Sequence, residues 1–176
     1  VPSQDLTIHM EQPESVKEGI VSIAYQWLNR RPHKSNEILP KQGHGVLFSV
    51  DHANSSLLGD MDYTRFTSDV FINYKIGAMV LYGRIKAVAM LGIPPSQNKI
   101  GLTDDTPIYF PTDNILAENE VINPRGWRGT RLGDRLVFCT LEYRTGSKKI
   151  SLALISDIAN AWDADINAMD DWVITG

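Results

Sequence analysis

The sequence has a single cysteine and few of the residue patterns that carry enzymatic chemistry. Cys139 excludes a disulfide within the chain and favours a reducing, intracellular compartment. The four histidines form no HxxxH or HExxH pair, and no GxSxG motif or phosphate-binding loop is present. The best acid–imidazole cluster, Asp51-His52 with Asp60 and Asp62, matches no known spacing of metal ligands. We therefore expect no metal ion, no cofactor and no small-molecule substrate.

The chain has no disordered composition and no apolar run long enough to span a bilayer. Its 176 residues are 43% hydrophobic and 22% charged, as is typical of one globular domain covering residues 1–176. The longest apolar run lies within Thr67–Pro95, and Arg84 and Lys86 interrupt it. The uninterrupted pieces are shorter than the roughly 20 residues that a membrane helix requires.

The central run predicts β-strands, although Ile76, Val80, Ala87 and Leu91 also fit the 3.6-residue repeat of a helix. Val70, Ile72, Tyr74 and Ile76 alternate with Asp69, Phe71, Asn73 and Lys75, a period of two that is typical of a strand with one buried face. We expect bends or bulges at Gly77 and Gly83. Further strands are predicted by alternation or apolar content at the positions that follow: 5–10, 43–51, 107–110, 135–144, 149–155 and, at an edge, 172–174. The pair 135–144 and 149–155 is predicted to form a hairpin.

Two helices are predicted. Val16, Ile20, Ile23, Ala24, Trp27 and Leu28 follow a helical stripe, after Pro13-Glu14 and before Pro32. A second helix would begin at Asp157 and carry Ile158, Ala161, Trp162, Ile166 and Met169. A single turn is expected at 114–120. The predicted fold is therefore α+β, with a mixed or antiparallel sheet, an N-terminal amphipathic helix and a C-terminal helix packed on it.

The net charge of −4 conceals two poles of opposite sign. We expect the basic pole to contact a membrane, a nucleocapsid or a neighbouring copy; with Trp127 it comprises Arg125, Arg128, Arg131, Arg135, Lys148 and Lys149. The complementary acidic patch comprises Asp157, Asp163, Asp165, Asp170 and Asp171. Such a chain can associate with copies of itself or lay its basic side on an anionic surface. Trp127 between arginines could alternatively stack a base, although the acidic pI of about 5.5 argues against nucleic acid.

One enzymatic hypothesis remains. Asp134, Glu142 and Arg144 resemble the acid/acid-x-lysine pattern of the restriction-endonuclease superfamily, in which two carboxylates hold a magnesium ion. The sequence departs from that pattern because Arg144 stands at the lysine position, and a guanidinium stays protonated. A magnesium-dependent nuclease is thus the alternative function.

The order of predicted elements resembles the matrix proteins of rhabdoviruses, whose plant-infecting members have similar lengths. The likeness consists of the strand 5–10, the helix 15–30, a β-rich middle, the hairpin, and the segment Asp157-Ile-Ala-Asn-Ala-Trp-Asp163. It implies a non-enzymatic virion protein that self-assembles, binds the anionic inner leaflet of a membrane and condenses nucleoprotein. The acidic net charge departs from that family, whose members are basic.

Overall fold

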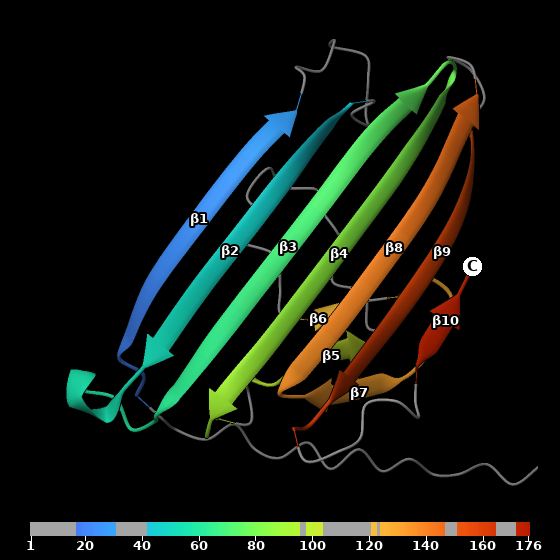
Figure 1. Ribbon diagram of the computed structural model, residues 1–176. Coiled ribbons are helices and arrows are strands. Elements are labelled where there is room, and N and C mark those ends of the chain that lie inside the picture. The colour runs from blue at the N-terminus through green and yellow to red at the C-terminus, as the bar shows by residue number, and fades with distance from the viewer. Residues whose placement is uncertain are drawn as a thin grey trace, which may run out of the picture.

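A long antiparallel β-sheet dominates the computed structural model of the protein (Figure 1). The structure describes residues 17–30, 42–95, 98–103, 121–122, 124–146, 151–164 and 172–176. In spatial order the seven strands of the large sheet are β1 (Ile20–Arg30), β2 (Gly43–Ala53), β3 (Tyr63–Ile76), β4 (Met79–Gly92), β8 (Arg135–Gly146), β9 (Ser151–Trp162) and β10 (Val173–Thr175).

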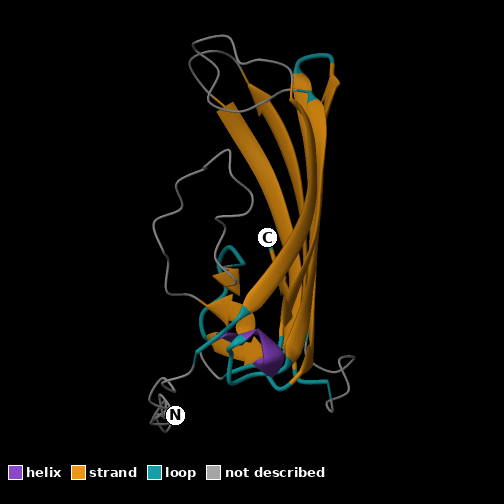
Figure 2. Ribbon diagram, turned by 90° about the vertical axis from the view of Figure 1, so that its left-hand side faces the viewer, coloured by secondary structure: helices purple, strands orange, loops and turns teal. Residues whose placement is uncertain are grey.

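A small second sheet lies against one end of the large one (Figure 2). Its strands, in spatial order, are β6 (Val121–Ile122), β5 (Ile100–Thr103) and β7 (Thr130–Gly133). The connection from β4 to β8 contains all three of these strands. The described residues include one 3₁₀ turn, η1 (Ser55–Leu57), which is capped by the side chain of Asn54. They contain no helix with the length and apolar character needed to cross a bilayer.

The predicted α+β class is wrong, because the described parts of both predicted helices are strands. All eleven residues of β1 pair with β2 in unbroken register, from Ile20 opposite Ala53 to Arg30 opposite Gly43. Its sequence alternates Val21, Ile23, Tyr25 and Trp27 with smaller or polar residues, and such residues favour a strand. Ile23 and Trp27 fit both the predicted helical stripe and this alternation, so the stripe alone did not distinguish a helix from a strand. Residues 15–16 lie outside the described part of the chain.

The predicted C-terminal helix is wrong for the same reason. Asp157 does not cap a helix, because β9 continues to Trp162 and each of its residues pairs with β8. Branched and aromatic side chains at Ile158 and Trp162 suit this pairing. Ile166 and Met169 lie outside the described residues, as do the elements predicted at 5–10, 107–110 and 114–120.

The other predicted strands within the described residues are confirmed, whereas the three strands of the small sheet were not predicted. The hairpin of β8 and β9, the strand from Gly43 and the edge strand β10 all form. Gly77, with φ of 61°, begins the two-residue turn between β3 and β4, a position that favours glycine. Gly83 forms no bulge, because it pairs in continuous register with Ile72 and Leu141.

The main core lies between the small sheet and the end of the large sheet where β8 begins. Ile100 and Leu102 of β5 are fully buried there. Their neighbours in the core are Val88, Met90, Leu136, Phe138, Ala159, Ala161 and Val173. The small sheet thus covers part of one face of the large sheet. No described element covers the opposite face (Figure 2).

Candidate interaction surface

The uncovered side of the large sheet, which we call the apolar face, carries most of the exposed hydrophobic side chains. Alternate residues of a strand share a face, and the strand registers place these residues side by side. One row crosses all seven strands: Trp27, Val46, Val70, Ile85, Cys139, Ile158 and Ile174. Many residues of this face are highly exposed: Ile23 is 74% exposed, Leu154 is 76% exposed and Ile174 is 70% exposed.

Charge is nearly missing from the apolar face. In the described strands of the large sheet, Arg135 is its one lysine, arginine or carboxylate residue, and His44 and His52 are its histidines. Surfaces of monomeric proteins rarely carry such large contiguous apolar areas, which mark sites of interaction with other molecules. The apolar face is therefore the candidate functional surface.

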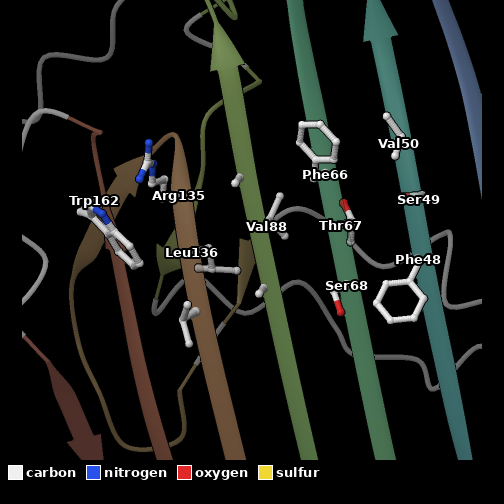
Figure 3. A pocket seen from close by; sticks show the side chains of 13 residues that line it. Phe48, Ser49, Val50, Phe66, Thr67, Ser68, Val88, Arg135, Leu136 and Trp162 are labelled. Atoms are coloured by element: carbon white, nitrogen blue, oxygen red, sulfur yellow. The ribbon is translucent and has the colours of Figure 1, made fainter.

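The apolar face has relief as well as area. On the apolar face of central strand β4, Gly83 lies on one side of Ile85 and Ala87 and Ala89 lie on the other, and these small residues leave two shallow grooves. One groove of about 370 Å³ lies beside Phe48, Phe66 and Trp162 (Figure 3). The other, of about 420 Å³, lies beside Ile72, Leu141 and Ile158. Protein layers interdigitate to crystal-like density, so a second layer would fill such grooves with its own side chains.

The opposite side, which we call the polar face, holds the ionic groups. Asp69 is 1% exposed and is held by Arg84, whose Nε donates to Oδ1 at 2.9 Å. Lys86, opposite Asp69 in the register, is also buried. The strands therefore bury charge on one side while exposing apolar side chains on the other. This is the reverse of the usual arrangement.

Arg125 is the centre of a second ionic cluster on the polar face. It follows β6, and its guanidinium donates to Asp157 at 3.0 Å, to Glu142 at 2.6 Å and to Thr140 at 2.6 Å. Arg144 forms a second ion pair with Glu142. These bonds attach the chain beside the small sheet to β8 and β9. They leave Asp157 only 1% exposed.

The pKa shifts in this cluster follow from burial opposed by hydrogen bonding. Burial alone would raise the pKa of Asp157, but hydrogen bonds from Arg125 and Thr140 outweigh it and hold that pKa below its ordinary value. Burial alone would lower the pKa of Arg125, yet its bonds to Asp157 and Glu142 raise it. Both shifts favour the charged forms, so Asp157 and Arg125 form an ionic crosslink at neutral pH.

The residues of the predicted basic pole do not form one surface. Arg125 is 44% exposed, but its guanidinium is bonded to Asp157 and Glu142 of its own chain. Arg131 donates to Asn160 at 2.9 Å, and Arg135 lies on the apolar face. Trp127 packs against the main core, which contrasts with the exposed position expected of it. Arg128 is exposed in the turn beside it. Lys148 and Lys149 lie outside the described residues.

The predicted acidic patch is divided in the same way. Asp157 is buried and bonded to Arg125, so two residues assigned to complementary surfaces of different copies meet inside one chain. Asp163 pairs with Lys99 of its own chain at 3.3 Å. Asp165, Asp170 and Asp171 lie outside the described residues.

The nuclease arrangement does not form. Asp134 immediately precedes β8 and Glu142 lies eight residues further along, which corresponds to roughly 26 Å of extended strand. One magnesium ion cannot bind both carboxylates at that separation. Glu142 is instead paired with Arg125 and Arg144. Among the described residues, no group of three or more His, Cys, Asp or Glu side chains is placed to hold a metal ion.

Comparison with known proteins gives no family assignment: no protein-family model matches the chain, and no curated protein is significantly similar to it. The sequence did contain a signal for the apolar face, namely the alternation in Tyr63–Ile76. There the charged residues Arg65, Asp69 and Lys75 all share one parity.

Acid is expected to weaken the fold through Asp157. Because its folded pKa is below its unfolded pKa, its contribution is complete above the unfolded value and is lost as pH falls through the folded value. Urea unfolding from pH 7 to pH 2, at fixed protein concentration, should show this loss. Asp157→Asn should flatten the acid slope by up to about 1.4 kcal/mol per pH unit. Asp163→Asn, at a half-exposed pair, should leave the slope nearly unchanged, and an unchanged slope in Asp157→Asn would contradict the assignment.

Proposed function

We propose that the protein is a non-enzymatic structural protein that self-associates by packing the apolar face of one copy against that of another. The observation that carries this proposal is the row of apolar side chains that crosses all seven strands without a covering layer. A sheet packed on a sheet, about 10 Å apart, is the standard way to bury such a face.

The size of the face supports a stable interface. Six long strands at about 4.8 Å spacing, each at least eleven residues long, span an area on the order of 1,000 Å². A standard protein interface buries about 800 Å² on each partner. The apolar face alone is therefore large enough for a specific dimer.

A second copy suits this face better than an anionic membrane surface does. Binding to anionic lipid headgroups depends on clustered lysine and arginine, and the described strands place only Arg135 on this face. A two-fold contact instead requires a surface that is complementary to itself. The apolar face offers both parts, because the grooves over β4 are flanked by protruding residues such as Phe66 and Leu141.

Sedimentation across protein and salt concentration tests the proposal. Salt at about 1 M screens charges beyond about 3 Å, whereas apolar burial is not weakened by it. We expect reversible, concentration-dependent association whose dissociation constant at about 1 M NaCl is no higher than at about 0.1 M. Association that weakens at high salt would instead favour contacts between charged surfaces. A monomer at all concentrations would contradict self-association.

The finer role stays a prediction. A matrix-type protein of a virion, bridging a membrane and nucleoprotein in a reducing compartment, would use such self-association. The resemblance that suggested this role depended on two helices whose described parts are strands. Binding to lipid vesicles and to nucleoprotein would each need a separate measurement, because neither follows from self-association.

A further inference from the structure

Strand β1 forms an open edge of the large sheet and differs from the edges that soluble proteins usually protect. It lies at the end of the strand order, and no other described strand pairs with its outer side. Every residue from Val21 to Asn29 is exposed, so neither face of the strand is covered. Its backbone groups on the outer side are thus accessible to another strand.

The usual protections against strand pairing are missing from β1. Natural edge strands carry lysine, proline or a bulge, or are very short. Ile20–Asn29 contains no charged residue and no proline, and the eleven-residue register with β2 has no bulge. Its branched and aromatic side chains favour strand pairing. The far edge of the sheet has one of these protections, because its edge strand β10 is only three residues long.

We infer that β1 is a second self-association site, at which β1 of one copy pairs antiparallel with β1 of another. Two copies related by a two-fold axis present the same strand in opposite directions, which extends an antiparallel sheet without altering its pattern. The full length of β1, roughly 36 Å, is available for this ladder. A strand from another protein could pair with the same edge, but it would not bring two copies of β1 together, so no disulfide could form between them.

This inference rests on the proposed function and changes the size of the assembly that self-association produces. A two-fold contact through the apolar face alone closes at a dimer. With a second two-fold contact at β1, each copy has two neighbours, one across the face and one across the edge. The two contacts lie on different surfaces, so both can be occupied at once. The assembly then exceeds a dimer: it closes at four copies if the two axes intersect at right angles and otherwise continues as a filament.

Two lysine variants of the full chain separate the two contacts. Ala24→Lys places a charge in the middle of β1, on the side opposite Val21, Ile23, Tyr25 and Trp27, so it spares the apolar face. Like charges near each other across the new ladder should weaken it roughly tenfold or more. Ile85→Lys acts on the apolar face and leaves β1 unchanged. Ala78→Lys, in the exposed turn after Gly77, is the matched control for Ala24→Lys.

Sedimentation and electron microscopy should show assemblies of four or more copies for the wild type and for Ala78→Lys, dimers for each single interface variant, and monomers for the double variant. If Ala24→Lys assembles as the wild type does, the edge inference is overturned while the proposed function stands. If Ile85→Lys assembles as the wild type does, the proposed function fails instead.

Cysteine scanning identifies the occupant of the edge. In a Cys139→Ser background, single cysteines at Ser22, Ala24 and Gln26 sample one side of β1. Mild oxidation should give a disulfide between two copies of β1 at one position, or between two neighbouring positions in mixed variants, where Cα atoms approach within about 7 Å. No β1–β1 disulfide at any position would exclude this pairing.

Discussion

Replacing Ile85 with lysine should weaken self-association by at least about 30-fold. Ile85 is 57% exposed at the centre of the apolar face, between Val70 and Cys139 in the strand register. Burying the exposed part of an isoleucine contributes on the order of 1 kcal/mol, and a two-fold contact contains two copies. A loss of about 2 kcal/mol corresponds to about 30-fold in the dissociation constant. Burial of an unpaired ammonium would increase the effect.

The matched control is Ile93→Lys. Ile93 is 76% exposed and follows the end of β4, so the same substitution changes a hydrophobic residue outside the sheet. Its dissociation constant should stay within about threefold of the wild type, since surface substitutions away from an interface change little. Analytical ultracentrifugation measures both variants, and circular dichroism establishes that the β-sheet is retained. Equal dissociation constants for Ile85→Lys and the wild type would contradict the role of this face.

Much of the sheet could be predicted from local sequence because alternation is a local property. The strands of the central run, the β8–β9 hairpin and the edge strand at Val173 followed from the period of two and from turn residues. The interpretation of the alternation was the difficult part. The more apolar side of an alternating strand usually faces the core, yet Val70, Ile72 and Tyr74 are 39%, 52% and 58% exposed. The opposite parity, with Asp69 and Asn73, is the buried one.

The reason lies in what the chain has available to cover its sheet. The two predicted helices would have covered the apolar face, but their described parts belong to the sheet and enlarge that face. The described cover is the small sheet, which packs on the polar side. Alternation shows which residues share a face. It cannot show whether that face is covered by the same chain or by another molecule.

The candidate site was harder to predict than the fold because charge was counted along the sequence. Arg125 and Asp157 are 32 residues apart and were assigned to opposite poles, but the packing beside β8 and β9 joins them. Glu142, which was considered as a metal ligand, forms ion pairs with Arg125 and Arg144. Linear charge clusters therefore overestimated the charge available to a partner. The alternate residues of β3 and β4 that carry no charge were a better guide to the interaction surface than the charge clusters.

Arg125→Met is expected to lower the free energy of unfolding by roughly 3 kcal/mol at neutral pH. Only the carboxylate of this ion pair is buried, and removing its partner is destabilising because the carboxylate then stays desolvated and unpaired. Asp157 is 1% exposed and would lose its guanidinium partner, and Glu142 would keep only Arg144. Methionine retains the unbranched apolar stem, so the change mainly removes charge and hydrogen bonds. Urea unfolding measures the effect, with Arg128→Met as the exposed control.

Two further measurements separate the ion pair from packing. The double variant Arg125→Met/Asp157→Asn should recover part of the lost stability, because it removes the charge that the single variant leaves buried. In Arg125→Met alone, burial should raise the pKa of Asp157 above its unfolded value. Protonation then stabilises the folded state, so the deficit relative to the wild type should shrink as the pH falls below about 4. A deficit that is independent of pH and unchanged in the double variant would show that Arg125 acts through packing alone.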